Sequence, residues 1–224
     1  MSNIILPRRT IAQRYELLEG LHKYGVNLDS REIVLQSNPD GEDGLDYCAA
    51  NIFIKNLLFL NNLNYFPIVI HQCTCGGCWN YGMAIYDAIV ASPSPTVLIA
   101  YAHARSMSSI IPQAAKKRVI HPNADFLIHF GGAGFEGDAR SFVAEGQKAD
   151  EIDRRMIDIY SGRCVKGPFF KKYSRDRVRK YLREQMNIRR EWYMSPAEAV
   201  HMGFMDGIYG TPGYRTIKEI LKKK

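Results

Sequence analysis

The chain has 224 residues, of which 46% are hydrophobic and 24% charged, with a formal net charge of +7. This length and composition are typical of a globular protein, and we expect a single domain over residues 1–224. No apolar run approaches the roughly 20 residues that a membrane span requires, and the amino-terminal apolar stretch precedes its arginines, opposite to a secretory signal, so we expect a cytoplasmic protein without a membrane partner.

The positive charge is concentrated in two segments, residues 166–190 and a basic tail over residues 215–224. Nucleic-acid binding requires a recognition motif or interleaved aromatic side chains beside such charge. The sequence has neither, so solvated basic surfaces are the favoured interpretation and no nucleic acid is expected as a partner.

After an N-terminal segment of residues 1–30, strands and helices are predicted to alternate. In chain order, the pattern predicts a strand over 32–36, a helix over 45–62, a strand over 67–71, a turn at Gly76-Gly77, a helix over 79–90, a strand over 96–100, a helix over 106–117, a strand over 125–129 and a long helix over about 137–160. Repeated strand–helix–strand units indicate an α/β fold with a mainly parallel sheet.

Three of the five cysteines follow a histidine, in the run His71-Gln-Cys73-Thr-Cys75-Gly-Gly-Cys78. A structural zinc site commonly uses two separated ligand pairs, and no second pair follows elsewhere. The metal interpretation stays open as a minor alternative, and we expect neither a metal nor another cofactor.

A serine, a histidine and a glycine pair are predicted at strand ends. Ser106 follows the strand 96–100 and begins a helix, His129 ends the strand 125–129, and Gly76-Gly77 follows a third strand. Separately, these residues are typical of a helix cap, a strand-end histidine and a tight turn. Because ligands of parallel α/β sheets bind at the carboxyl ends of strands, their coincidence indicates a site with a nucleophile and a base.

Four motifs resemble the proteolytic subunit of the Clp protease, in that family's order and spacing. They are Gly76-Gly-Cys-Trp-Asn-Tyr-Gly-Met-Ala-Ile-Tyr-Asp87, Arg105-Ser106-Met107, His121-Pro-Asn-Ala-Asp-Phe-Leu-Ile-His129, and Tyr193-Met-Ser-Pro-Ala-Glu-Ala199 with Gly203-Phe-Met-Asp206. The resemblance covers about Glu32 to Tyr209. It implies the β/α spiral that this family shares with the crotonases, and residues 137–160 as a protruding handle helix that joins rings.

The resemblance implies a serine endopeptidase, with Ser106 as nucleophile and His129 as general base. The backbone N–H groups of Gly77 and Met107 would form the oxyanion hole.

The Gly131-Gly132 stretch would bind the peptide backbone as an extended strand. The resemblance further implies stacked heptameric rings that enclose the active sites, with peptides or unfolded polypeptides as substrates.

The third member of the triad departs from the family pattern. The family has an aspartate four residues before the serine of the last motif, and the corresponding residue here is Glu191. Asp176 is the alternative, within the basic stretch of residues 162–190, which is longer than its family counterpart and is predicted to add a surface helix near residues 176–185.

Other departures lie at Arg105, Cys78 and Trp79. Arg105 replaces a small residue and would either act as a cation beside the site or face away, while Cys78 and Trp79 replace small or aliphatic residues.

The family's docking groove for an AAA+ unfoldase uses aromatic residues, and the corresponding positions here are Val69 and His71. Losing aromatic anchors weakens an apolar docking pocket, which argues against the usual unfoldase partner. Two alternative functions stay open: a catalytically silent scaffold subunit of the same fold, and a crotonase-like acyl-CoA enzyme.

Overall fold

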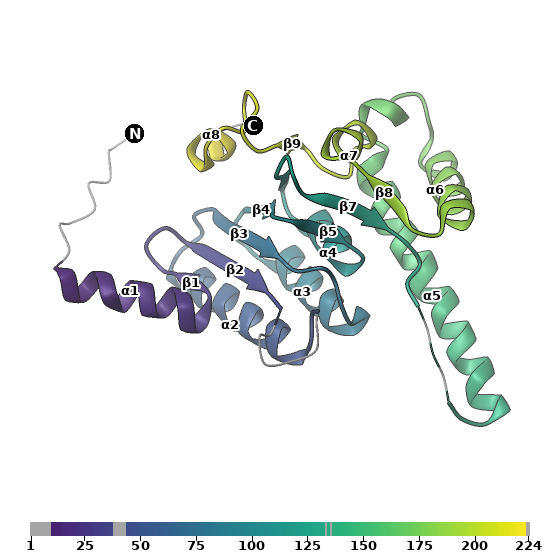
Figure 1. Cartoon of the computed structure of the whole chain (residues 1–224), viewed down its shortest axis with the longest axis horizontal. Helices are drawn as coiled ribbons and strands as arrows, with labels where there is room; N and C mark the ends of the chain where they lie inside the picture. Colours follow the sequence, from purple (N-terminus) through teal and green to yellow (C-terminus); the bar gives the residue numbers. More distant parts are fainter. Residues whose placement is uncertain (1–9, 38–43, 133, 135, 223–224) are drawn as a thin grey trace.

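A computed structural model describes residues 10–37, 44–132, 134 and 136–222. The larger of its two sheets has six strands, and every neighbouring pair is parallel except the first, β1–β2. In spatial order these strands are β1 (Val26–Asn27), β2 (Glu32–Gln36), β3 (Ile68–Cys73), β4 (Thr96–Ala100), β6 (Lys117–Ile120) and β9 (Gly207–Ile208). The prediction of an α/β fold with a mainly parallel sheet is confirmed (Figure 1).

A smaller, three-stranded sheet stands beside the first in Figure 1. It contains β5 (His103–Arg105), β7 (Asp125–Ile128) and β8 (Trp192–Met194). Strand β7 is central, and it pairs in parallel with β5 and antiparallel with β8.

Helices connect and cover these strands. They are α1 (Ile11–Tyr24), α2 (Tyr47–Leu63), α3 (Trp79–Ala91), α4 (Met107–Ile110), α5 (Ala139–Cys164), α6 (Arg175–Arg189), α7 (Pro196–Met202) and α8 (Ile217–Lys222), with 3₁₀ helices η1 (Ile111–Ala114) and η2 (Pro168–Phe170). Helix α2 begins where the Asp46 side chain accepts a hydrogen bond from the Ala49 N–H at 2.8 Å. Its buried residues Phe53, Leu57 and Leu60 recur at helical spacing and join the main core with β2, β3 and α3.

The helix predicted over residues 106–117 is wrong in its second half. Helix α4 ends at Ile110, η1 follows, and residues 117–120 form strand β6. Pro112 lies inside η1 and has no N–H to continue an α-helix. Strand β6 then pairs with β4, with Ile99 opposite Val119.

Helix α5 covers the stretch predicted as a handle, and it projects away from both sheets in Figure 1. Its buried residues all lie from Met156 onward, whereas Phe142 and Val143 in its first turns are exposed. Helix α6 packs against α5 and buries Val178, Leu182 and Met186. The surface helix predicted near residues 176–185 is therefore present and longer at both ends.

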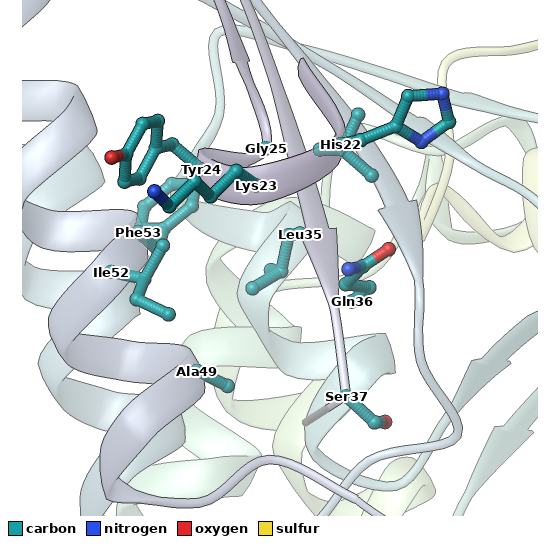
Figure 2. Close-up of a pocket in the computed structure, with 11 residues that line it drawn as sticks. His22, Lys23, Tyr24, Gly25, Leu35, Gln36, Ser37, Ala49, Ile52 and Phe53 are labelled. Atoms are coloured by element: carbon teal, nitrogen blue, oxygen red, sulfur yellow. The ribbon is translucent and has the colours of Figure 1, made fainter. Parts of the chain in front are cut away.

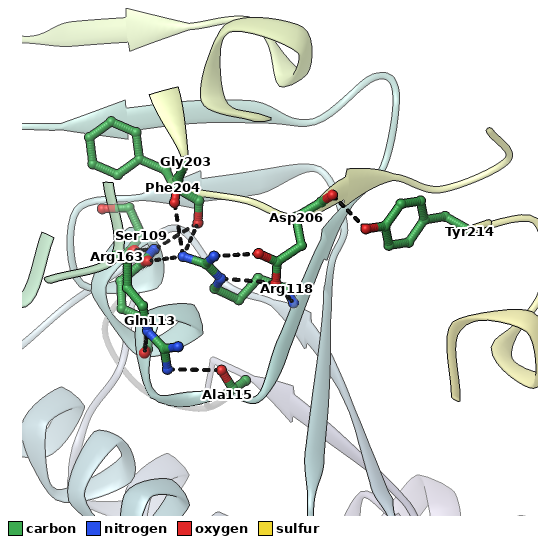
Figure 3. Close-up of polar contacts among 9 residues, drawn as sticks. All are labelled: Ser109, Gln113, Ala115, Arg118, Arg163, Gly203, Phe204, Asp206 and Tyr214. Atoms are coloured by element: carbon green, nitrogen blue, oxygen red, sulfur yellow. Dashed lines mark hydrogen bonds and ion pairs between the residues drawn. The ribbon is translucent and has the colours of Figure 1, made fainter. Parts of the chain in front are cut away.

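A buried arginine ties strand β6 to the chain just before β9 (Figure 3). Arg118 is 6% exposed and donates to the carbonyl oxygens of Gly203 and Phe204 at 3.0 and 3.1 Å. It also donates to Gln113 Oε1 at 2.8 Å and forms an ion pair with Asp206. The guanidinium thus satisfies polar groups that would otherwise be buried without partners.

The opposite face of the larger sheet carries a second, smaller core. Val69, Ile99 and Val119 pack there with Tyr214 and with Ile220 of α8. Residues 217–222 of the expected basic tail therefore form a helix that packs on the sheet, while residues 223–224 lie outside the described part of the chain.

Beside this second core, four rings form a continuous row. Tyr101 and Tyr209 stack on either side of His121, with ring centroids 4.2 and 4.6 Å away. Tyr101 Oη also lies 2.9 Å from Nδ1 of His71. Burial, and to a smaller extent the neighbouring His71, lower the pKa of His121.

Candidate active site

Ser106 follows strand β5 of the smaller sheet rather than strand β4 of the larger one, which corrects its predicted place. Its backbone N–H donates to the Leu127 carbonyl at 3.1 Å, and the next residue, Met107, begins α4. Its φ of 52° and ψ of −128° are strained for a residue with a side chain. Such strain is typical of functional positions held by their surroundings.

His129 and Glu191 meet because β7 and β8 are antiparallel. Ile128 lies opposite Trp192, so the residue after β7 and the residue before β8 leave the sheet at the same end. His129 Nδ1 and Glu191 Oε1 are 2.8 Å apart, and the two side chains are 21% and 56% exposed. The other ring nitrogen of His129, Nε2, is buried and has no hydrogen-bond partner among the described residues.

Asp176, the alternative acid, has a different environment. It lies in the first turn of α6, its side chain is 85% exposed, and it pairs with Arg179 at 2.7 Å. The structure therefore brings Glu191, and not Asp176, into contact with His129.

The Gly76-Gly77 turn passes close to Ser106. Gly76 has φ of 119°, and a Cβ at this position would lie 2.8 Å from the Ser106 Cβ, so only glycine permits this approach. Leu45 pairs with Gly77 in a parallel bridge: the Leu45 N–H donates to the Gly76 carbonyl, and the Cys78 N–H donates to the Leu45 carbonyl. Because the Gly76 carbonyl accepts from the Leu45 N–H, and the C=O and N–H of one trans peptide group point in opposite directions, the Gly77 N–H points away from Leu45.

A cavity of about 420 Å³ lies beside Ser106 and His129. The predicted site residues that line it are Gly77, Ser106, Met107, His129, Gly131 and Gly132. Met107 is the first residue of α4, so its N–H has no acceptor within the helix. Within the part of the chain that the structure describes, no hydrogen bond joins Ser106 to His129; such contacts are often long before substrate binds.

The inner wall of the cavity was not predicted from the sequence. Ala149, Ile152, Asp153 and Met156 of α5 line it together with Ile110. Ala149, Ile152 and Met156 recur at intervals of three and four, which places them on one helical face. This periodicity was the available signal, whereas their placement beside Ser106 depends on tertiary packing.

Arg105 faces away from this cavity, which decides between its two predicted roles. Its guanidinium forms an ion pair with Asp125 and lies 5.5 Å from the ring centroid of Tyr193. The cation that precedes Ser106 in the sequence is therefore neutralised on the outer side of the smaller sheet.

Cys73, Cys75 and Cys78 are exposed free thiols. Across residues 10–37, 44–132, 134 and 136–222, no group of three or more His, Cys, Asp or Glu side chains could hold a metal ion. Trp79 packs against the main core, and both Cys78 and Trp79 line the cavity of Ser106.

A second cavity, of about 70 Å³, lies between the end of α1, strand β2 and helix α2 (Figure 2). Its polar lining residues include His22, Gln36 and Ser37. No hydrogen bond connects these three side chains to one another in the described structure, so the larger cavity is the better candidate for chemistry.

A serine on a strained turn, a carboxylate-bound histidine and inward backbone N–H groups on an α/β fold are features of serine hydrolases. The family model for the Clp protease matches residues 21–212. This chain belongs to the Clp protease family.

The chain is 29% identical over 162 residues to the ATP-dependent Clp protease proteolytic subunit of Deinococcus radiodurans. The aligned stretch covers 71% of this chain and 73% of that protein. The described helices include none that is both long enough and apolar enough to cross a bilayer.

Proposed function

We propose that the protein is a serine endopeptidase that cleaves peptides or unfolded polypeptides, with Ser106, His129 and Glu191 as its catalytic triad. One observation carries this proposal. Glu191 holds Nδ1 of His129, which leaves a buried Nε2 without a partner on a residue that lines the same cavity as the strained Ser106.

In this mechanism, Ser106 Oγ attacks the carbonyl carbon of the scissile peptide bond while His129 Nε2 accepts its proton. The negative charge that develops on the carbonyl oxygen is stabilised by the N–H groups of Gly77 and Met107. The C–N bond then breaks, and His129 returns the proton to the leaving amine. Water, deprotonated by His129, hydrolyses the acyl-enzyme and regenerates Ser106.

Gly131 and Gly132 line the open side of the cavity. A Cβ added at either position would meet no atom of the described residues within 4 Å, so these residues leave space for a substrate. Their backbone groups are suited to bind an extended peptide as an additional strand.

The proposal includes assembly into stacked heptameric rings in the cytoplasm. The first half of α5 supports it, because this stretch projects from the body and exposes Phe142 and Val143 by 65% and 58%. Exposed apolar residues on a projecting helix are typical of an interface between copies. At the positions that correspond to the family's docking groove, Val69 is covered by the second core and His71 contacts Tyr101. These contacts offer no aromatic anchor of the usual kind, so the proposal does not depend on an AAA+ unfoldase as partner.

The test is labelling with a fluorophosphonate, which reacts with activated serines, combined with cleavage of an internally quenched peptide. The wild-type protein should be labelled and active, and Ser106→Ala should be neither. His129→Ala should lose activity by several orders of magnitude while keeping its circular dichroism spectrum. Robust cleavage by Ser106→Ala would overturn the proposal.

A second candidate function is a catalytically silent scaffold subunit of the same family. The absence of a Ser106–His129 hydrogen bond in the described structure favours it. A scaffold would assemble without being labelled, whereas the proposed peptidase is labelled in its assembled form. The crotonase-like acyl-CoA alternative is not favoured, because the family match is to the Clp protease.

A further inference from the structure

The wall that α5 contributes to the cavity beside Ser106 is apolar except for one carboxylate. Met107, Ile110 and Met156 are almost fully buried around it, and Ile152 is half-buried. Asp153, on α5, lines the same wall and is also only half-exposed. A charged group among such neighbours needs a counter-charge, because desolvation disfavours an isolated ion.

Asp153 has no bonded counter-charge among the described residues. Among the described residues, its carboxylate forms no hydrogen bond and no ion pair, although other acidic residues of α5 do, such as Glu151 with Lys148 and Asp158 with Arg179. Burial raises the pKa of Asp153, the charge of Arg183 partly offsets this, and Asp150 adds to it. Asp153 is thus a desolvated acid that a cation entering the cavity would stabilise.

The geometry of the proposed reaction determines which part of a substrate enters the cavity beside Ser106. The attacked carbonyl carbon must lie about 3 Å from Ser106 Oγ, with its oxygen at the N–H groups of Gly77 and Met107. The residue that supplies this carbonyl carries its side chain on the adjacent Cα. That side chain is therefore the one nearest the cavity wall. Its apolar stem would contact Ile152, and a terminal cation would reach Asp153.

We propose that Asp153 is a specificity-determining residue that selects substrates with lysine or arginine immediately before the scissile bond. This inference rests on the proposed peptidase function and names its substrate class. A lysine side chain meets both properties of the cavity, because its four methylenes suit the apolar wall and its ammonium suits the carboxylate.

The test uses peptides that are identical except for the residue before the scissile bond, which is lysine, norleucine or glutamate. Norleucine keeps the methylene stem of lysine without its charge. Wild-type kcat/KM for lysine should exceed that for norleucine by about tenfold, a difference of about 1.4 kcal/mol, and glutamate should be poorest. Asp153→Asn should reduce the lysine-to-norleucine ratio to near one.

Two matched variants separate this role from others. Asp150→Asn removes the same charge one turn away on the exposed side of α5, and the ratio should stay at the wild-type value. Arg183→Gln removes the cation whose charge acts on Asp153 and should leave the ratio unchanged or raise it. If Asp153 served only to pair α5 with α6 through Arg183, Asp153→Asn and Arg183→Gln would both destabilise the protein and neither would change the ratio.

Binding measurements keep the inference testable without catalysis. Fluorescence anisotropy of the labelled lysine and norleucine peptides is measured with Ser106→Ala and with the double variant that adds Asp153→Asn. A preference for lysine that Asp153→Asn abolishes supports the inference, even if the wild-type protein cleaves nothing and the proposed function fails. Efficient cleavage with equal or greater preference for norleucine overturns the inference and leaves the proposed function intact.

Discussion

Replacing Glu191 by glutamine separates the proposed catalytic role of this residue from its contribution to stability. The hydrogen bond to His129 Nδ1 is 2.8 Å long, but the Glu191 side chain is 56% exposed. Ion pairs this accessible to solvent contribute within about 1 kcal/mol to folding. We therefore expect Glu191→Gln to change the free energy of unfolding, measured by urea titration, by no more than that.

The expected effect on catalysis is much larger. The amide of glutamine can donate to Nδ1 and so favours the tautomer with its proton on Nε2, which cannot accept the Ser106 proton. The amide also fails to stabilise the imidazolium that forms in the transition state. We expect kcat on a quenched peptide to fall by about 10²–10⁴-fold, equivalent to about 2.7–5.4 kcal/mol.

Two further variants calibrate this measurement. Glu191→Asp shortens the arm by one methylene and should retain partial activity if the backbone before β8 closes the gap. The Asp176 carboxylate pairs with Arg179 on α6, so Asp176→Asn should have wild-type activity. Glu191→Gln with more than a third of wild-type kcat would refute the triad role, and loss of activity in Asp176→Asn would refute the assignment of the acid.

Three further predictions concern strain, buried charge and pH. Ser106→Gly should be more stable than Ser106→Ala by about 1 kcal/mol in denaturant titrations, because glycine adopts a φ of 52° without strain; equal stabilities would show that the turn is relaxed. Arg118→Met should lose about 3 kcal/mol of unfolding free energy, because it removes the cation that pairs with Asp206 and a hydrogen-bond donor to the Gly203 and Phe204 carbonyls, and an unchanged urea midpoint would contradict this. Lowering the pH below about 6.5 should reduce the unfolding free energy, because the pKa of His121 is lowered in the folded state, so the unfolded chain binds the proton first. His121→Phe keeps a ring between its stacked neighbours but cannot titrate, and it should therefore lose less stability than the wild-type protein between pH 7.5 and 5.

Local patterns predicted strands β2, β3 and β4 of the larger sheet, because these are runs rich in apolar residues, whereas β1, β6 and β9 were not predicted. Strand β4 has the predicted bounds, 96–100, since all five residues are buried. Strand β6 was missed because its four residues follow an apolar stretch that continues the helical pattern past Pro112. The proline was the signal that the helix stops.

The smaller sheet could be predicted only in part. Strands β5 and β8 have three residues each, which is too short for a period-two pattern to be recognised. The contact between His129 and Glu191 depends on the antiparallel register of β7 and β8, across 62 positions of sequence. Family resemblance suggested that contact, whereas residue periodicity carried no information about it.

The candidate site has two parts that the structure holds differently: the backbone N–H groups of Gly77 and Met107, and the side chains of Ser106 and His129. The N–H groups of Gly77 and Met107 are fixed by backbone contacts, because Leu45 bridges to Gly77 and the Leu127 carbonyl holds the strained turn at Ser106. Ser106 and His129, in contrast, line one cavity without a hydrogen bond between them in the described structure. We therefore expect that an inert and an active form of this chain would share the proposed oxyanion site and differ in the contact between Ser106 and His129. If a substrate carbonyl binds to the N–H groups of Gly77 and Met107 as proposed, peptide binding can precede the formation of the Ser106–His129 contact, and binding and labelling experiments then report on separate steps.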